Sequence, residues 1–203
     1  MAEGVARPWR VLLLGGTTAV GKSTIAPQVA KALGFTLISA DSIWRAITSI
    51  TTAQTHPVLF QWPRPEVVPD DPSHLLQVHI EEAAAITPAL DAFLTWEMKE
   101  GNRFVMQGAW LTPEFAARKC AASPKVRAVF IDEPEENAIM SSILERSKRT
   151  EPDARQQIVG KVAWLYGNWL CKQAQQHGVP QVGRNPKETL ADRIIAAAEG
   201  AMK

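Results

Sequence analysis

Short runs of apolar residues alternate along the chain with longer stretches in which apolar residues recur every three or four positions. The apolar runs are the expected strands: Val11 to Leu14, Phe35 to Ala40, Arg103 to Gln107, Val126 to Ile131, and a short fifth strand beginning at residues 178–180. Such runs lack the alternating polar face of a half-exposed strand. They are typical of a parallel sheet that is covered on both sides.

Helices are expected where the apolar spacing is three to four residues. The expected ranges begin at Lys22 or Ser23 and near Ser42, and then cover 75–99, 135–149, 153–177 and 190–202. Pro88 falls inside the third range and should kink or split that helix. Strands alternating with helices predict an α/β fold in three layers, with a doubly wound parallel sheet of about five strands.

The chain of 203 residues is long enough for one core, and no linker divides it, so residues 1–203 are expected to form one domain. Residues 48–100 are expected to form an insertion that binds the substrate. Its first part, 48–73, holds five prolines and no sustained periodicity, which favours a loop-rich segment that covers the substrate. A disordered surface excursion is the alternative, although Leu59, Phe60 and Trp62 favour packing.

A glycine-bracketed loop, Gly16-Thr17-Thr18-Ala19-Val20-Gly21-Lys22-Ser23, lies between the first strand and the first helix. Glycine at both ends lets backbone N–H groups converge on phosphate oxygens, and the start of the helix adds its partly positive end. Lys22 would reach the β- and γ-phosphates of ATP, and the Ser23 hydroxyl is suited to Mg²⁺. The expected phosphate site is Gly16, Thr17, Thr18, Ala19, Val20, Gly21, Lys22, Ser23 and, more weakly, Thr24. An ordinary glycine-rich turn would not explain why two glycines, a lysine and a serine coincide here.

The second expected strand ends at Asp41, where a new helix begins. In an open parallel sheet the ligand crevice lies beyond the carboxyl ends of the strands, so Asp41 should face the same cleft as Lys22. It could accept the proton of an acceptor hydroxyl, hold Mg²⁺ through water, or only cap the helix. Arg45 lies four residues on and shares its helix face, where it would hold an anionic group of the acceptor or remain a solvated charge.

Basic residues cluster at the end of the helix expected over 135–149, namely Arg146, Lys148 and Arg149. Phosphoryl transfer needs positive charge around the migrating group, and residues 140–155 would form a lid that supplies it. Arg146 and Arg149 are three residues apart and should share a helix face. A solvated helix end that complements the helix dipole is the competing interpretation.

Charge and cysteine usage narrow the function classes. The formal net charge of +1 does not favour a nucleic-acid partner, and the two cysteines have neither pairing nor metal-ligand spacing. No stretch approaches the length of a membrane span and no secretory signal is recognisable, so a cytoplasmic protein is expected. The four histidines have no ligand spacing. His79 is expected on a helix surface, and Glu81 and Glu82 are expected to be solvated.

Three motifs make the chain resemble the P-loop small-molecule kinases, most closely the group similar to 2-phosphoglycerate kinase. They are residues 15–26 around the phosphate loop, Ile38-Ser39-Ala40-Asp41-Ser42-Ile43, and Val105-Met106-Gln107-Gly108-Ala109-Trp110-Leu111-Thr112-Pro113; residues 185–190 are a weaker echo near the nucleotide base. Only the first motif is highly specific. The resemblance implies a fold similar to nucleoside and shikimate kinases, and ATP- and Mg²⁺-dependent phosphoryl transfer to a small acceptor. It also favours a lid role for Arg146 and Arg149.

The chain departs from the family pattern at Gln107, where a carboxylate usually ends the third strand. A neutral amide can orient the acceptor or a metal-bound water, but it cannot offset the charge of the cation. Asp41 is then the expected cleft carboxylate, with Asp132 as an alternative.

The sequence therefore predicts an ATP-dependent phosphotransferase that acts on a small, anionic metabolite. Three alternatives stay open: a P-loop hydrolase or switch, a polynucleotide 5′-end kinase, and a module that binds nucleotide without transfer. The oligomeric state and the identity of the acceptor are not specified by any motif.

Overall fold

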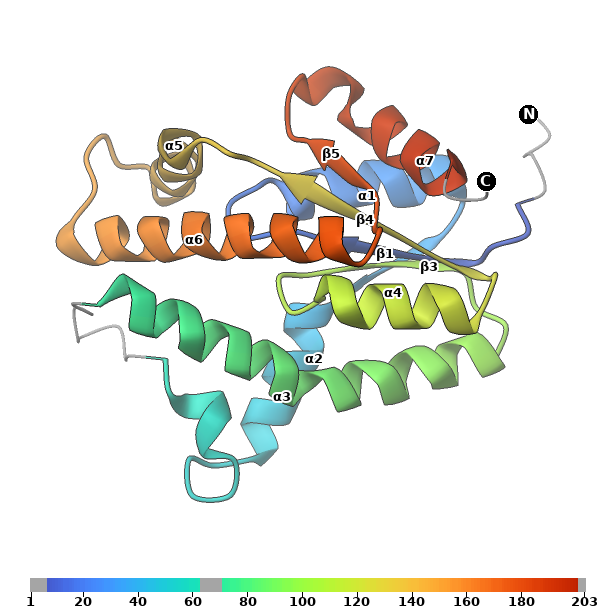
Figure 1. Ribbon diagram of the computed structural model, residues 1–203, viewed down its shortest axis with the longest axis horizontal. Coiled ribbons are helices and arrows are strands. Elements are labelled where there is room, and N and C mark those ends of the chain that lie inside the picture. The colour runs from blue at the N-terminus through green and yellow to red at the C-terminus, as the bar shows by residue number, and fades with distance from the viewer. Residues whose placement is uncertain (1–6, 63–70, 201–203) are drawn as a thin grey trace.

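The computed structural model describes residues 7–62 and 71–200, which form a parallel five-stranded sheet with helices on both faces (Figure 1). The strands are β1 (Val11–Gly15), β2 (Thr36–Ser39), β3 (Phe104–Gln107), β4 (Val126–Asp132) and β5 (Gln181–Gly183). Their order in the sheet is β2-β3-β1-β4-β5, and every neighbouring pair is parallel. The expected α/β class, strand number and direction are therefore confirmed.

The register aligns the carboxyl ends of the three strands that carry the sequence motifs. Leu14 of β1 lies opposite Gln107 of β3, and Gln107 lies opposite Ser39 of β2. The phosphate loop after β1 and the segment beginning at Ala40 therefore leave the sheet at the same edge. That edge is where an open parallel sheet binds its ligands.

The helices are α1 (Lys22–Leu33), α2 (Ala40–Ile50), α3 (Pro72–Lys99), α4 (Pro113–Ala122), α5 (Glu136–Ser147), α6 (Ala154–Gln176) and α7 (Leu190–Gly200). Two 3-10 turns, Pro57–Phe60 and Lys187–Thr189, complete the described elements. Helix α4 was not expected from the apolar spacing, although Thr112 caps it by accepting a hydrogen bond from the Phe115 N–H at 3.3 Å. A threonine followed by proline at the first helical position is a recognisable start signal.

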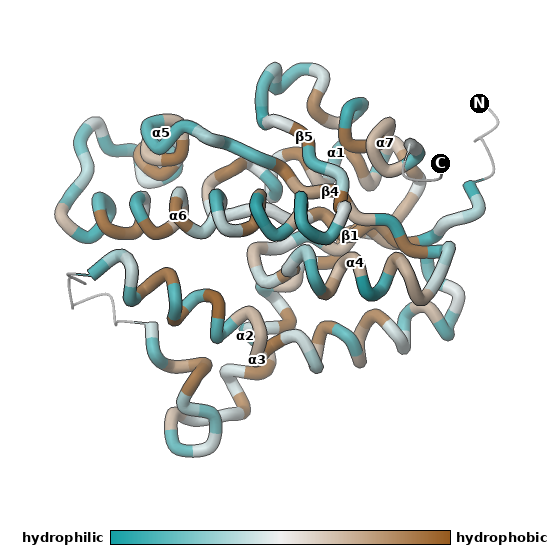
Figure 2. Tube along the Cα trace, in the orientation of Figure 1, coloured by the Kyte–Doolittle hydropathy of each residue, from teal (hydrophilic) through white to brown (hydrophobic). Residues whose placement is uncertain are grey.

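The two faces of the sheet bury separate hydrophobic clusters. Side chains alternate along a strand, so Val11 and Leu13 of β1 pack with residues of α3, α4 and α6, whereas Leu12 and Leu14 pack with residues of α1 and α7. Both faces of β1 are fully buried, which explains its uninterrupted apolar sequence. Figure 2 shows the hydrophobic positions gathered along β1 and β4, between the two helical layers.

Of the two outcomes expected at Pro88, a kink or a split, the structure shows the kink: helix α3 is continuous across Pro88 and changes direction near its middle (Figure 1). Proline lacks the N–H that would bond one turn back, which weakens the helix locally without ending it. The two halves remain one helix because buried residues on both sides of Pro88, among them Ile86 and Leu90, pack in the same cluster.

The segment expected to be loop-rich is only partly so. Helix α2 extends to Ile50, the 3-10 turn after it buries Leu59 in the core, and α3 starts at Pro72, where Asp71 accepts a hydrogen bond from the Ser73 N–H at 2.9 Å. Residues 63–70 of the expected cover, and residues 201–202 of the last expected helix, lie outside the described residues. No helix in the described ranges is both long and apolar enough to cross a membrane.

Candidate functional site

The loop after β1 adopts the open turn that a phosphate site needs. Gly16 has a φ of 138° and Gly21 a φ of 101°, both in the region that favours glycine. A Cβ on Gly16 would also lie 2.8 Å from the Ile131 carbonyl oxygen, so a side chain there would push the loop away from β4. Ala19 takes a φ of 65° without being glycine, a conformation that is uncommon outside functional turns.

Lys22 begins α1 directly after the loop, and its ammonium group curls back over the loop. The Nζ donates a hydrogen bond to the Thr17 carbonyl oxygen at 2.6 Å, and only 6% of the residue is exposed. Burial lowers the pKa of Lys22 to about 8; the charge of Asp41 acts to raise it and that of Arg146 to lower it further. The group is therefore poorly solvated and close to two charged residues from other elements. A bound polyphosphate would restore the charged form.

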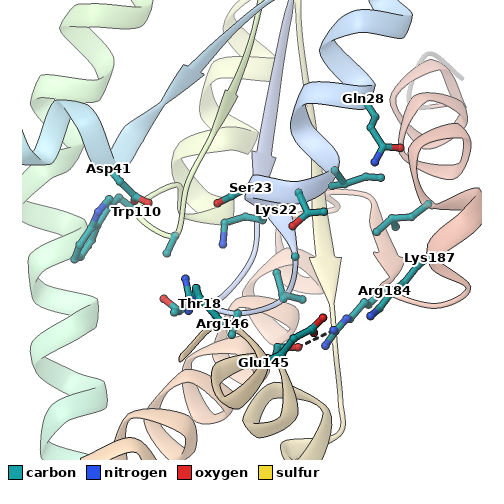
Figure 3. Close-up of a pocket in the computed structure, with 18 of the residues that line it drawn as sticks. Thr18, Lys22, Ser23, Gln28, Asp41, Trp110, Glu145, Arg146, Arg184 and Lys187 are labelled. Atoms are coloured by element: carbon teal, nitrogen blue, oxygen red, sulfur yellow. Dashed lines mark hydrogen bonds between the residues drawn. The ribbon is translucent and has the colours of Figure 1, made fainter. Parts of the chain in front are cut away.

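A cleft of about 730 Å³ opens in front of this loop (Figure 3). Residues 18–24 line it, so six of the expected phosphate ligands together with Thr24 face the same space. Ser23 and Thr24 are exposed there, in the first turn of α1. The site thus combines a helix start that no side chain caps, a lysine and an exposed hydroxyl, which is the set that a nucleoside triphosphate requires.

Thr17 supports the loop on the side that contacts α6 and does not line the cleft. Its hydroxyl donates a hydrogen bond to the Ala163 carbonyl oxygen of α6 at 2.5 Å, and the residue is buried. A Cβ on Gly167 of the same helix would lie 3.1 Å from the Thr17 methyl group, so α6 approaches the loop closely at this point. Neither Gly16 nor Thr17 lines the cleft, and both shape the loop that does.

Asp41 and Arg45 lie on one face of α2 and both line the cleft opposite Lys22. Figure 3 shows Asp41 beside Trp110 on one side of Lys22, with Arg146 and Arg184 across from them. The residue preceding α2 is Ser39, and no side chain caps the helix, so the capping alternative for Asp41 finds no support. The Arg45 guanidinium lies 5.1 Å from the ring centre of Trp44, which keeps it over the cleft wall.

The structure separates the two arginines that were expected to share a helix face, so that expectation is wrong. Helix α5 ends at Ser147, and Lys148 turns the chain with a φ of 55°. Arg146 lines the cleft, whereas Arg149 lies beyond the turn, outside the cleft lining, and pairs with Asp153 at 2.6 Å. The spacing argument failed because it assumed that the helix continues through residue 149.

Gln107 ends β3 but does not line the cleft. Its amide donates a hydrogen bond to the Ser39 hydroxyl at 3.2 Å, and its carbonyl oxygen is buried without a hydrogen-bond partner in the described part of the chain. It thus links β3 to the end of β2, two residues before Asp41. Asp132, the alternative carboxylate, accepts a hydrogen bond from the Cys171 thiol at 2.8 Å and likewise lies outside the cleft lining.

Several cleft residues were not singled out by the sequence. Arg184, which follows β5, donates to the Ser142 hydroxyl at 2.7 Å and lies 3.8 Å from Glu133. Lys187 and Leu190 line the same end of the cleft, in the segment whose sequence resembles the family near the nucleotide base. Only tertiary contacts bring Arg184 here, since no local pattern distinguishes it from a surface arginine.

His79 and Glu82 of α3 were expected in solvent, and both expectations are wrong. The His79 ring lies 4.3 Å from that of Tyr166 and 4.8 Å from that of Trp110, and burial lowers its pKa to about 4. Glu82 is 2% exposed, and burial raises its pKa to about 7. The missed signal is the spacing of Val78, Glu82 and Ile86, which puts the acid on the buried stripe of the helix.

The oxygen ligands that line the cleft fit a Mg²⁺ ion that binds together with a nucleotide. In residues 7–62 and 71–200, no group of three His, Cys, Asp or Glu residues could hold a metal by itself. A hard cation prefers oxygen ligands, and Mg²⁺ keeps several waters while it binds substrate phosphates and one or two protein oxygens. The Ser23 hydroxyl and the Asp41 carboxylate are among the oxygens that the cleft offers.

Comparison with known proteins finds several 2-phosphoglycerate kinases among the relatives, although no family model matches the chain. The chain is 21% identical over 196 residues to a 2-phosphoglycerate kinase of Methanopyrus kandleri, covering 92% of this chain and 59% of that protein. It is 25% identical over 192 residues to a 2-phosphoglycerate kinase of Thermococcus kodakarensis, covering 91% and 64%. The chain thus spans about three fifths of the length of these relatives.

Solved structures carry the same fold. Shikimate kinase from Acinetobacter baumannii in complex with shikimate superposes with a TM-score of 0.58 and 14% identity, covering 96% of both chains. At this identity the likeness establishes the fold and no more. The resemblance to 2-phosphoglycerate kinases is confirmed by the two relatives, whose names agree with the expected enzyme class, an ATP-dependent phosphotransferase. The fold is confirmed by the solved structure.

Proposed function

We propose that this chain transfers the γ-phosphoryl group of ATP to a hydroxyl group of a small acceptor. The observation that carries the proposal is the single cleft that Lys22 and Ser23 share with Asp41, Arg45 and Arg146. A phosphate cradle alone would support binding only. A carboxylate and two further cations facing that cradle are what transfer to a second molecule requires.

The loop and Lys22 bind the triphosphate in this proposal. Backbone N–H groups of residues 18–23 cradle the phosphates, and the Lys22 ammonium group leaves the Thr17 carbonyl to contact the β- and γ-phosphates. Arg146 approaches from α5 and stabilises the charge that spreads over the migrating group. Residues 140–155 act as the lid that carries it. Arg184 and Lys187 lie at the far end of the cleft, where the rest of the nucleotide extends.

Mg²⁺ bound with ATP would offset the charge of the phosphates. The Ser23 hydroxyl would hold it directly, and Asp41 would reach it through water or act on the acceptor hydroxyl instead. Asp41 is exposed in the first turn of α2 and lines the cleft, which supports either role. In the second role it accepts the proton of the attacking hydroxyl.

The acceptor lies between α2, α3 and the loop. Arg45 holds an anionic group of the acceptor, if it has one, at the rim of the cleft. The relatives are named for 2-phosphoglycerate, an anionic acceptor of this kind, so 2-phosphoglycerate and glycerate are the first compounds to test.

The test is a screen of hydroxylated and phosphorylated metabolites for stimulated ADP formation, beside a reaction without acceptor. A kinase consumes ATP only when the right acceptor is present. Steady ADP formation that no acceptor changes would favour the hydrolase or switch. Measurable ATP affinity without ADP formation would favour the binding module.

A further inference from the structure

A second cavity of about 230 Å³ adjoins the nucleotide cleft on the side of α3 and α6. Its walls carry four aromatic side chains, Trp44, Trp62, Trp110 and Tyr166, together with His79 and Glu82. We call this cavity the aromatic chamber. Thr18, Trp44, His79 and Trp110 line both the chamber and the cleft, so the two spaces meet beside the phosphate loop.

The walls of the chamber are held by contacts of their own. The Trp44 and Trp110 rings stack at 5.6 Å with an angle of 18° between their planes. The Tyr166 hydroxyl donates a hydrogen bond to the Ala109 carbonyl oxygen at 2.9 Å, and His79 lies edge-on to its ring. Flat surfaces fixed in this way favour a flat ligand, because planar groups gain the most contact against aromatic faces.

Two polar atoms of the chamber residues have no partner. The Trp44 indole N–H, a donor, and the Glu82 Oε1, an oxygen of a residue that is 2% exposed, are both buried without a hydrogen bond among the described residues. Leaving such groups unpaired is costly, and buried polar atoms are nearly always satisfied. A ligand that accepts from Trp44 and donates to Glu82 would satisfy both.

The charges around the chamber disfavour an ionic occupant. No described Lys or Arg lines it, and Glu82 is its one carboxyl group, so an anion would face an acid while the nearest counter-charge, Lys22, lies outside the chamber walls. Lys22 is near enough for its charge to help keep the pKa of His79 low, and it opposes a second cation. An uncharged group avoids both the repulsion of an anion by Glu82 and the repulsion of a cation by Lys22.

The size of the chamber also limits its occupant. A cavity of about 150 Å³ takes up benzene, so 230 Å³ suits one substituted six-membered ring. It is smaller than the pockets of several hundred Å³ that bury a drug-sized molecule.

We propose that the aromatic chamber is the acceptor subsite, and that the acceptor places there a flat, uncharged ring with a hydrogen-bond donor facing Glu82 and an acceptor facing the Trp44 indole N–H. This proposal rests on the proposed phosphotransferase, because it assigns the chamber to the second substrate. It favours hydroxylated acceptors with a ring over open-chain acceptors such as 2-phosphoglycerate and glycerate, and any anionic group they carry stays at the rim beside Arg45.

The experiment uses benzamide as the probe, with benzoate and benzamidine as its anionic and cationic counterparts of the same shape. ¹⁵N-labelled protein without nucleotide is titrated with each compound, and the seven tryptophan indole N–H signals are followed by NMR. Benzamide should shift the Trp44 signal saturably, while the signals of Trp9 and Trp96, outside the chamber, stay in place. Benzoate should bind at least tenfold more weakly.

Substitutions in the chamber walls test which groups the probe contacts. Trp44→Phe keeps an aromatic ring and removes the N–H, and its missing signal assigns the Trp44 resonance. Trp44→Phe and Glu82→Leu should each weaken benzamide about threefold to tenfold, the effect of one lost hydrogen bond, followed on the Trp110 signal. Glu81→Leu is the matched control, since Glu81 is the exposed neighbour on the same helix and lies outside the chamber. It should leave the affinity unchanged.

The proposal is overturned if benzamide does not shift Trp44 saturably, or if neither substitution weakens it. Tighter binding of benzamidine would replace it with a cation site, and equal binding of benzoate would contradict the charge argument. Benzamide should also compete with any acceptor that stimulates ADP formation, and failure to compete would remove the chamber from the acceptor site. If no acceptor stimulates ADP formation, the phosphotransferase fails while benzamide binding remains measurable.

Discussion

The two connected spaces of this molecule are built in opposite ways. The nucleotide cleft is centred on one continuous loop, to which α1, α2, α5 and the segment after β5 add side chains, and its main binding groups are backbone N–H groups and cations. The aromatic chamber is assembled from α2, α3, α6, the phosphate loop and the segments after β3 and after the Pro57–Phe60 turn, and its binding groups are ring faces, one acid and one indole N–H.

This difference separates binding of the triphosphate, which all reactions of this kind share, from recognition of the acceptor, which is specific. The triphosphate is the same in every reaction of this kind, so a backbone cradle that ignores side-chain identity is sufficient for it. The acceptor must be chosen, and choice depends on side chains that leave a wrong ligand unsatisfied. The predictions below disturb one space at a time.

The largest effect is expected from Lys22→Ala. Loss of the only cleft lysine beside the loop in the described ranges should reduce ATP turnover roughly 10²–10³-fold, the range seen when one fixed electrostatic contact is removed from a transition state. The thermal midpoint should stay near that of the parent, because the ammonium group is poorly solvated and donates to the Thr17 carbonyl oxygen alone among the described residues. Lys31→Ala, at an exposed site in the same helix, is the control. An unchanged rate in Lys22→Ala would remove the residue from the mechanism.

Asp41→Asn should reduce transfer roughly 10²-fold, as expected for a lost general base, while ATP affinity changes much less. The amide keeps the shape of the side chain and loses its charge and basicity. Single-turnover rates and ATP titrations on the same preparation separate the two quantities. Equal losses in rate and affinity would instead assign Asp41 a positional role toward the nucleotide.

Arg146→Ala should lower kcat about tenfold, and Arg149→Ala less than about threefold. Arg146 lines the cleft, whereas Arg149 pairs with Asp153 in an exposed contact, and exposed pairs contribute little. Steady-state kinetics of the two variants test the assignment directly. A larger loss in Arg149→Ala would mean that the lid rearranges enough to exchange the two arginines.

The smallest effect concerns the chamber acid and the free energy of unfolding. Burial raises the pKa of Glu82 to about 7, so the folded state holds this proton more tightly than the unfolded chain, and stability falls as pH rises from about 4.5 through 7. Glu82→Gln removes this loss, so its free energy of unfolding should exceed that of the parent by roughly 1–2 kcal/mol at pH 8 and by little at pH 4.5. This gain is smaller than the whole pKa shift would give at about 1.36 kcal/mol per pKa unit. Chemical denaturation at both pH values measures the difference.

Glu81→Gln is the matched control for that measurement. Its side chain is exposed and accepts a hydrogen bond from Gln77 at 2.9 Å, so its effect should be small and independent of pH. A gain in Glu82→Gln that is equal at both pH values would contradict a buried, titrating acid.

The sequence placed residues 18–24 and Asp41 in one cleft because the signals are local. A strand, six loop residues and a helix are contiguous, and Asp41 follows from the rule that parallel strands end at one edge. Arg149 was misplaced because a single left-handed residue, Lys148, ended the helix early. Nothing in the charge cluster itself marks that turn.

The chamber was not predicted because it depends on packing between distant segments. Tyr166 and Trp110 meet His79 only when α3, α6 and the segment after β3 are in place. The spacing of Glu82 between Val78 and Ile86 did carry a local signal of burial. The position of an acidic residue on the buried face of a helix is therefore a better guide to its location than its polarity, which predicts exposure.

The most direct test of the central claim follows the γ-phosphoryl group of ATP itself. Wild-type protein is incubated with Mg²⁺, ATP labelled with ³²P at the γ-position, and either no acceptor or a mixture of hydroxylated ring compounds and 2-phosphoglycerate. The account predicts that the label moves into an organic phosphate only when acceptors are present. Label released solely as inorganic phosphate, at a rate that the acceptors do not change, would contradict it.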